Sequence, residues 1–440
     1  MLQALGQVEL PRPAVLAVVR RELAALRSEK SVGDFDAVLA RIQTALNSLY
    51  LSRIQPVINA TGVLIHTNLG RAPLGQPVVE TLSTIAANYN SLEYDLASGD
   101  RGGRALYLEH NLAILCGAEA TTVANNCAAA LLLILRHFTG NSRKEVIISR
   151  GELIQIGGGF RIPQILEASG ATLREIGTTN MTSLRDYAKA ISRETALILK
   201  VHRSNFSMGG FVESPSTVEI AKLASERRVP FVEDLGSGAV LDTQELASID
   251  HEPTSAEVLA QGAQLVCFSG DKLLGGVQAG IIAGRQKLVG ALKREPFFRA
   301  LRCDKLILSA LQTVVDLYLH GEENKIPLLE MLQMPLEELR RRADKLLLTL
   351  ADQKVTARIG EGKARIGGGS LPASAVASIT VDLVPHNVGL EAFAERLRLG
   401  SPAVIAYISS GGCRLDLRTV FPRQDEDLAR AIRAALQYRE

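Results

Sequence analysis

Short apolar runs alternate with mostly helix-length segments between residues 122 and 283, and this alternation constrains the fold more than any other feature. The runs are Thr122–Ala124, Glu145–Ser149, Thr172–Ile176, Ala196–Val201, Val229–Glu233, Gln264–Phe268 and Ala279–Ala283. Such short, continuously apolar runs are typical of strands that are buried on both faces. The pattern predicts a doubly wound, mostly parallel seven-stranded α/β sheet, with the active site at the carboxyl ends of its strands.

The segments on either side of this region have a different pattern. Residues 1–53 predict a small helical domain, since apolar residues recur at helical spacing in two stretches. Residues 54–310 are the predicted large α/β domain. A long helical stretch is expected over 304–350, with an α+β pattern beyond it, and residues 311–440 are predicted to form a small α+β domain. Its expected strands and helices are Val376–Leu383, Val404–Ile408, Arg414–Arg418, Glu391–Leu399 and Glu426–Tyr438.

Composition argues against several classes of protein. The net charge of +2 is too small to indicate nucleic-acid binding by itself, although it leaves room for a local basic patch. No apolar run reaches the roughly 18 residues that span a bilayer, and the first residues lack a signal-peptide pattern. The cysteines and histidines are scattered without metal-ligand spacing, so no metal site is expected. We therefore expect a soluble cytoplasmic protein with reduced thiols.

Two strand-end loops carry the strongest chemical signal. Lys272 follows a buried strand within Ser269–Gly276, where desolvation would keep its amine neutral and nucleophilic. Asp234 ends the preceding strand within Val232–Gly238, where a carboxylate can pair with a pyridinium nitrogen. Each feature has an ordinary alternative, a solvated loop lysine or a helix-capping aspartate. Together, 38 positions apart, they resemble the fold-type I pyridoxal-phosphate enzymes.

Further candidates lie at neighbouring strand ends. Asn125 or Asn126 caps a helix that begins near Cys127, and the free amides of such a helix form an anion site that suits the cofactor phosphate. Ser269 offers a hydroxyl to the same phosphate. His202 ends another strand, so its ring can lie over or beside the cofactor. An ordinary capped helix and a structural histidine remain the alternatives.

Five arginines are candidate anion ligands, because the forked donors of a guanidinium group suit a phosphate-like oxyanion. They lie in the segments Asn68–Arg71, Ser98–Arg104 and Phe297–Arg302 and are Arg71, Arg101, Arg104, Arg299 and Arg302. Spacing alone favours the simpler interpretation that these are surface residues in salt bridges.

The sequence resembles the bacterial L-seryl-tRNA(Sec) selenium transferases, the selenocysteine synthases, over nearly its whole length. The matching stretches include the loops around Asp234 and Lys272, together with Ile58–Val63, His66–Leu74, Tyr94–Arg104, Ser149–Leu153, Phe160–Pro163, Arg299–Arg302, Ile366–Pro372 and Leu415–Arg418. These motifs are long and are not shared with general aminotransferases.

The resemblance implies an enzyme with pyridoxal 5'-phosphate on Lys272, seryl-tRNA(Sec) as substrate and selenophosphate as selenium donor. It implies that residues 1–53 hold the tRNA, that the five arginines hold the selenophosphate oxyanion and that the chain forms a homodecameric ring of dimers. Lys272 would be the base at the seryl Cα, and the β-hydroxyl would leave before selenium adds. Five residues depart from the family pattern: Cys127, Met181, Arg203, Val277 and Tyr407.

Two other functions compete with this interpretation. The same scaffold serves a small-molecule ammonia-lyase or β-eliminase acting on a phosphorylated amino acid, with the arginines binding its phosphate. The helical unit at 1–53 argues against that function, because a small substrate needs no such appendage. A non-catalytic tRNA-binding protein is a further alternative, and the presence of both Lys272 and Asp234 argues against it.

Overall fold

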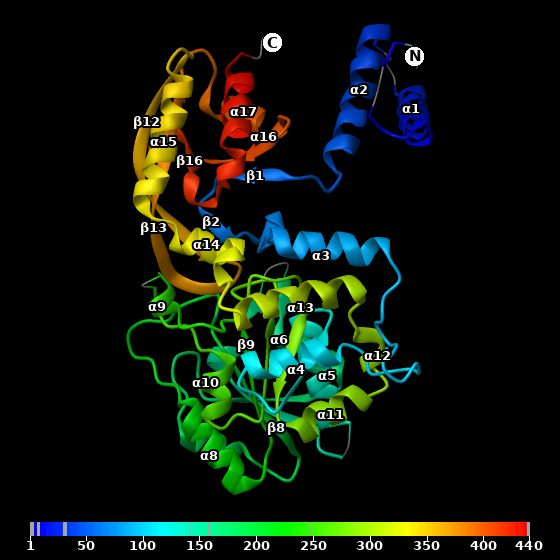
Figure 1. The fold of residues 1–440 in the computed structure, drawn as a ribbon, viewed down its shortest axis with the longest axis vertical. Helices are drawn as coiled ribbons and strands as arrows, with labels where there is room; N and C mark the ends of the chain where they lie inside the picture. Colours follow the sequence, from blue (N-terminus) through cyan, green and yellow to red (C-terminus); the bar gives the residue numbers. More distant parts are fainter. Residues whose placement is uncertain are drawn as a thin grey trace.

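The computed structural model describes residues 4–6, 9–29, 33–140, 142–156, 159–247 and 249–437. Figure 1 shows a large α/β unit at the bottom, with the C-terminal unit and the two N-terminal helices above it. No helix within the described ranges combines the length and the apolar character needed to cross a bilayer.

The large unit is built on the expected seven-stranded sheet, with strand order β3-β11-β10-β9-β8-β4-β7. Only β11 runs antiparallel to its neighbours, so the sheet is mostly parallel, as predicted. All seven predicted runs are strands, with ends that differ by two residues at most, except for the later end of β9. The strands are β3 (Ala120–Ala124), β4 (Glu145–Ser149), β7 (Thr172–Ile176), β8 (Thr195–Val201), β9 (Phe231–Gly236), β10 (Leu265–Ser269) and β11 (Gly280–Gly284).

Helices bury both faces of this sheet, which explains why its central strands are apolar on both sides. The core on one face includes side chains from α5 (Cys127–Thr139), α6 (Ile162–Ser169) and α11 (Gln286–Arg294). The core on the other face includes side chains from α4 (Leu106–Leu115), α7 (Leu184–Ala190), α8 (Thr217–Arg227), α10 (Ser255–Ala260) and α13 (Lys305–Leu319). The fold is therefore doubly wound, as the sequence pattern predicts.

The helical stretch expected over 304–350 is present, but it is broken into separate helices. Three helices occupy it: α13, α14 (Pro327–Gln333) and α15 (Leu336–Leu350). Gly321 adopts a left-handed φ of 69° just after α13, where glycine carries no steric penalty. Pro327 and Pro335 then begin new helices, because proline cannot continue a preceding one. The expected domain boundary at 310 falls inside α13, whose apolar side chains belong to the core of the large unit.

The C-terminal unit has a five-stranded sheet with order β15-β16-β13-β12-β2. Its long hairpin pairs β12 (Val355–Gly367) with β13 (Ser370–Pro385), and its helices are α16 (Leu390–Leu399) and α17 (Asp425–Gln437). The expected end of the last helix, Tyr438, lies outside the described residues. The remaining strands are β14 (Ala403–Ile405), β15 (Tyr407–Ser409) and β16 (Gly412–Asp416).

Residues before the large sheet complete this C-terminal unit. Strand β1 (Val57–Asn59) pairs with β14, and β2 (Val63–Ile65) pairs with β12. The chain therefore enters the C-terminal unit before it builds the large one. The large unit therefore does not begin at the expected residue 54, because residues 57–65 pack with the C-terminal unit.

The two N-terminal helices, α1 (Arg12–Arg27) and α2 (Phe35–Leu51), form a hairpin with an apolar core of its own. Val15, Val18 and Val19 of α1 face Ile42 and Leu46 of α2 in this core. Asp34 caps α2 by accepting a hydrogen bond from the backbone N–H of Ala37. The hairpin is thus a small helical unit, as the spacing predicts.

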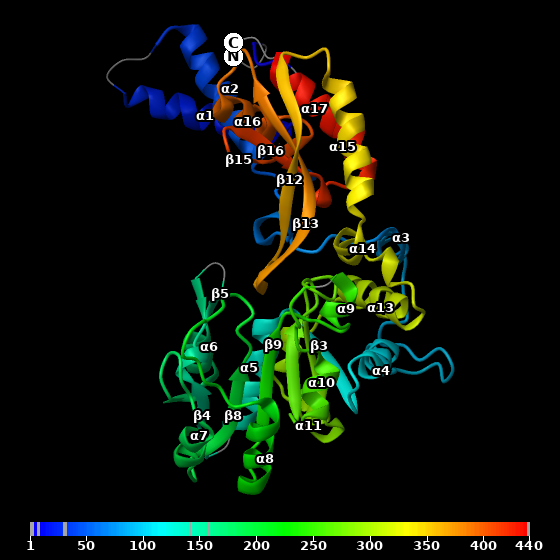
Figure 2. The ribbon, with the colours of Figure 1, turned by 90° about the vertical axis from the view of Figure 1, so that its left-hand side faces the viewer.

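The β12–β13 hairpin extends from the C-terminal unit toward the large sheet (Figure 2). Its tip, Gly367–Gly369, has three consecutive left-handed residues with φ of 77°, 63° and 71°. A side-chain carbon at Gly369 would lie 3.8 Å from Nζ of Lys272. The C-terminal unit therefore forms one wall beside this lysine.

Candidate functional site

One cavity of about 310 Å³ lies at the carboxyl ends of β8, β9 and β10. We call it the lysine cavity. It brings together seven of the residues predicted from the sequence: Arg71, Asn126, Cys127, His202, Asp234, Ser269 and Lys272. Parallel strands end at the same edge of a sheet, which explains why residues so distant in sequence meet here.

Lys272 is buried, with 4% of its surface exposed, in the turn that follows β10. The turn is held by a hydrogen bond from the Leu273 backbone N–H to the Ser237 carbonyl. Burial lowers the pKa of the Lys272 amine below its ordinary value, and the nearby Arg71 guanidinium adds to this effect. A lowered pKa increases the fraction of the amine that is neutral and therefore nucleophilic.

Arg71 holds the residue that directly precedes Lys272 in its turn. Its Nη1 donates to both carboxylate oxygens of Asp271, at 3.0 and 2.8 Å, and Asp271 directly precedes Lys272. The backbone N–H of Ala72 also donates to the Asp271 carbonyl. Asp271 was not predicted from the sequence. Its role depends on contact with Arg71, which is 200 positions away in the sequence.

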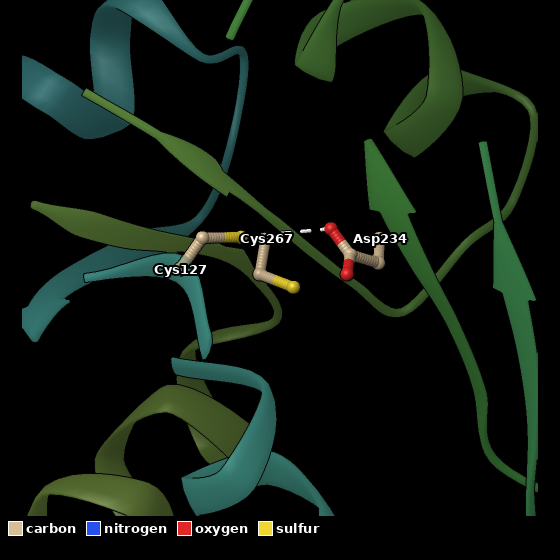
Figure 3. Close-up of side chains that lie close together, drawn as sticks. All are labelled: Cys127, Asp234 and Cys267. Atoms are coloured by element: carbon tan, nitrogen blue, oxygen red, sulfur yellow. Dashed lines mark hydrogen bonds between the residues drawn. The ribbon is translucent and has the colours of Figure 1, made fainter. Parts of the chain in front are cut away.

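Asp234 is buried at the end of β9, and burial raises the pKa of its carboxyl group, while Lys272 opposes that rise. The Cys127 thiol donates to Oδ1 of Asp234 at 3.6 Å, and Cys267 of β10 lies beside both residues (Figure 3). A side-chain carbon at Gly236 would lie 3.9 Å from both Asp234 Oδ1 and Lys272 Nζ. The carboxylate and the amine therefore face the same small volume.

Helix α5 directs its N-terminus at this cavity. Asn126 is its N-cap and accepts a hydrogen bond from the Ala129 backbone N–H at 2.9 Å. The amides of Cys127 and Ala128, in the first turn, have no carbonyl partner within the helix. Such amides bind a phosphate group readily, and Ser269 lines the same cavity. Asn125 does not line the cavity, and its backbone N–H donates to the Leu301 carbonyl.

His202 follows β8 directly, and its backbone N–H donates to the Asp234 carbonyl at 2.8 Å. The imidazole Nε2 lies 3.2 Å from Oε1 of Glu252, a buried residue outside the predicted set. No pattern in the sequence marked Glu252, because it comes from a loop 50 positions later in the chain.

The remaining four arginines do not reach the lysine cavity. Arg104, Arg299 and Arg302 line a separate cavity of about 460 Å³, which we call the arginine cavity. Glu93 forms ion pairs with three of the four arginines, with Arg101 and Arg104 at 2.7 Å and with Arg302 at 3.6 Å. Both cavities exist within one chain, but they are lined by different residues. Of the five departures from the family pattern, only Cys127 lines the lysine cavity.

A buried acid lies beneath the site. Glu152 is 4% exposed, and burial raises the pKa of its carboxyl group to about 8. The Val201 backbone N–H and the charge of Lys200 lower this pKa, and the charge of Glu233 raises it. The folded protein therefore holds the Glu152 proton more tightly than the unfolded chain does.

This proton gives stability a pH dependence. Because the folded pKa is raised, the contribution of Glu152 is fully present below its unfolded pKa, near 4.3, and is lost as pH rises through about 8. We expect the free energy of unfolding to fall by a few kcal/mol over that window, and by less in Glu152→Gln. Urea denaturation at several pH values measures this, with exposed Glu175→Gln as control. Equal slopes for wild type and Glu152→Gln would remove Glu152 as the cause.

Comparisons with known proteins show the family of this chain. The sequence model of the L-seryl-tRNA selenium transferase family matches residues 57–421. An L-seryl-tRNA(Sec) selenium transferase from Carboxydothermus hydrogenoformans is 44% identical over 394 residues, which are 89% of this chain and 84% of that protein. The Aquifex aeolicus protein of the same name is 43% identical over 407 residues, covering 92% of this chain and 88% of its own.

A solved structure shows the same fold at greater distance. D-Glucosaminate-6-phosphate ammonia-lyase aligns with a TM-score of 0.62 and 18% identity, over 87% of this chain and 96% of that one. The architecture is that of the fold-type I enzymes, as expected. Since the family model covers most of the sequence and the relatives cover most of their own length, the chain belongs to the L-seryl-tRNA selenium transferase family.

Proposed function

We propose that this enzyme converts L-seryl-tRNA(Sec) to L-selenocysteinyl-tRNA(Sec), with pyridoxal 5'-phosphate as cofactor and selenophosphate as selenium donor. The observation that carries the proposal is the meeting of Lys272 and Asp234 in one buried cavity, in a chain of this family. Formation of selenocysteinyl-tRNA by the purified protein is the direct test. Charged tRNA is a cytoplasmic substrate, so we place the enzyme in the cytoplasm.

The lysine cavity fits the cofactor by the chemistry of its donors. Lys272 would hold the aldehyde carbon, since its buried amine has a lowered pKa. Asp234 would pair with the ring nitrogen, and the first amides of α5, with Ser269, would hold the phosphate. His202 would lie beside the ring. When bound, the cofactor supplies an electron sink for charge that develops at the seryl Cα.

The residues of this chain then divide the remaining work. Lys272 would take the proton from the seryl Cα, because its neutral amine is a base in a dry cavity. Asp234 would supply a negative charge that favours the protonated form of the cofactor's ring nitrogen. Lys272 would pass this proton to the β-hydroxyl, which would leave as water. The selenium of hydrogen selenophosphate would then bond to the β-carbon while Lys272 carries its proton to Cα, and water would break the selenium–phosphorus bond, releasing phosphate and leaving the selenol. The hairpin tip at Gly367–Gly369 limits access of water from one side.

The arginine cavity would hold the selenophosphate oxyanion. Its guanidinium groups suit a phosphate-like anion, but within one chain they do not line the lysine cavity. Five exposed apolar side chains lie in the part of the chain that contains Arg101 and Arg104: Tyr89, Tyr94, Leu96, Leu106 and Tyr107. Exposed apolar patches commonly mark interfaces. We infer that copies of this chain meet here, in the decameric ring that the family resemblance implies, and that the arginines of one copy serve the Lys272 of another.

Shared sites make a testable prediction. We expect Lys272→Ala and the double variant Arg299→Ala/Arg302→Ala each to be inactive alone, and hybrid oligomers of the two to regain selenium transfer. The reason is that a hybrid pairs an intact lysine cavity from one copy with intact arginines from the other. Co-expression with two different affinity tags isolates the hybrids for the assay.

The control combines Lys272→Ala with Arg294→Ala, an exposed residue outside the arginine cavity. Those hybrids should show the activity of the Lys272-containing copies alone. Hybrids of the first kind that stay inactive, although both proteins are present in the oligomer, would show that each chain uses its own arginines.

The N-terminal hairpin would hold the tRNA. Its helices pack on each other through an independent core, while Arg20, Arg21 and Arg27 remain exposed. With a net charge of only +2, recognition would depend on shape and local basic contacts rather than on a general attraction. The lyase alternative is not favoured, since the ammonia-lyase structure shares only 18% identity and supports the fold alone.

A further inference from the structure

A buried carboxylate outside the predicted site points at it. Glu252 is 2% exposed, and its Oε1 lies 3.2 Å from Nε2 of His202, which lines the lysine cavity. Among the described residues, this oxygen has no partner that meets hydrogen-bond geometry. A buried carboxylate without a partner is costly, so an unpaired oxygen directed at one imidazole needs an explanation.

The backbone around Glu252 is held from two sides. The Glu252 N–H donates to the Thr243 hydroxyl at 2.9 Å, and that hydroxyl donates to the Asp250 carbonyl at 2.7 Å. The Asp250 carboxylate accepts from the Ser374 hydroxyl of β13 at 2.7 Å. The loop is therefore tied to the large unit and to the hairpin of the C-terminal unit, which holds the backbone of Glu252 in place beside His202.

We propose that Glu252 is a positioning residue that acts through His202. An ionised carboxylate 3.2 Å from Nε2 favours the tautomer that carries the proton on that nitrogen, which leaves Nδ1 unprotonated and free to accept a hydrogen bond. Fixing the tautomer and the plane of a functional histidine through a neighbouring carboxylate is a general device in enzymes. This inference rests on the proposed function, because it assigns His202 to the cofactor site.

A purely structural role for Glu252 makes different predictions. If Glu252 only anchored its loop, its removal would lower stability without changing the state of one histidine ring. The chain supplies a matched control in the same segment: Glu257 Oε2 lies 3.3 Å from His251 Nε2, and both residues are about 40% exposed. The two histidine–glutamate pairs differ in burial and in their relation to the lysine cavity.

The first test uses the enzyme without cofactor or substrate, so that it does not depend on selenium transfer. The protein has seven histidines, and solid-state ¹⁵N NMR of histidine-labelled protein separates their tautomers. The His202 signals are assigned by their loss in His202→Asn. We expect wild type and Glu252→Gln to show protonated Nε2 and unprotonated Nδ1, since the glutamine oxygen still accepts. We expect Glu252→Ala to show a mixture of tautomers.

Turnover of the loaded enzyme gives the second measurement. We expect Glu252→Ala to lower kcat about 10- to 100-fold with KM for seryl-tRNA(Sec) unchanged within about twofold, which is the scale seen when a ligand-orienting group is lost. Glu252→Gln should restore most of kcat, and Glu257→Ala should match wild type. A protonated Nδ1 in the wild type, or one persistent Nε2–H tautomer in Glu252→Ala, would overturn the proposal. Inactivity of the wild type with the expected tautomer would instead count against selenium transfer alone.

Discussion

Lys272→Ala is expected to abolish selenium transfer, with a loss of at least about 10⁴-fold, because one side chain provides both the cofactor link and the base. The buried amine has no substitute in the lysine cavity, since the other cationic group that lines it, Arg71, is held by Asp271. The purified variant should also lack the visible absorption band of a lysine-linked cofactor. Absorbance spectra and single-turnover assays measure the two effects separately.

The matched control for this change is Lys287→Ala, on the exposed surface of α11. It should keep both the band and the activity. Lys272→Arg retains the positive charge but cannot form the link, so it should behave like the alanine variant. A Lys272→Ala enzyme that keeps the band would place the cofactor on another lysine and would refute this assignment.

The second large effect is expected for Asp234→Asn. Without the charge that favours a protonated ring nitrogen, the electron sink is weaker, and we expect kcat to fall on the order of 100-fold or more, which is about 3 kcal/mol of activation free energy. Burial raises the pKa of Asp234, so its ionised form depends on the opposing positive charge in the cavity. The asparagine variant keeps the shape of the side chain and should still bind the cofactor, with an altered spectrum.

Kinetics and cofactor titration measure these two properties of Asp234→Asn. Asp242→Asn, an exposed residue in the same segment, serves as the control. Cys127→Ser should have a small effect, since the serine hydroxyl can still donate to Oδ1 of Asp234. Wild-type turnover in Asp234→Asn would show that the ring nitrogen does not need this carboxylate.

The sequence predicted those parts of the molecule in which local pattern and burial agree. The apolar strands of the large sheet were found because helices cover both of its faces. Lys272, Asp234 and His202 could be predicted to lie at one edge of the sheet because its strand ends converge, and all three line the lysine cavity. Strand β12 was not found, since its glycines, such as Gly360 and Gly362, suppress the strand signal. These glycines are needed because a side-chain carbon would collide with Thr380.

Other features depend on contacts that no local pattern contains. Glu252 and Asp271 acquire a role only when His202 and Arg71 are brought beside them. Arg101, Arg104, Arg299 and Arg302 were predicted from the resemblance to the family, but their separation from the lysine cavity is a property of tertiary packing. The break after α13 did have a local signal in Gly321, Pro327 and Pro335, and this signal outweighs the apolar periodicity across it.

The central claim is tested most directly by a single-turnover assay of the cofactor-loaded enzyme with seryl-tRNA(Sec) and selenophosphate. The prediction is that selenocysteinyl-tRNA(Sec) forms in stoichiometric amount with the wild-type protein and is absent with Lys272→Ala. A wild-type enzyme that carries the cofactor band but forms no selenocysteinyl-tRNA(Sec) would contradict the selenium-transfer function, and phosphorylated amino acids would then be the substrates to assay.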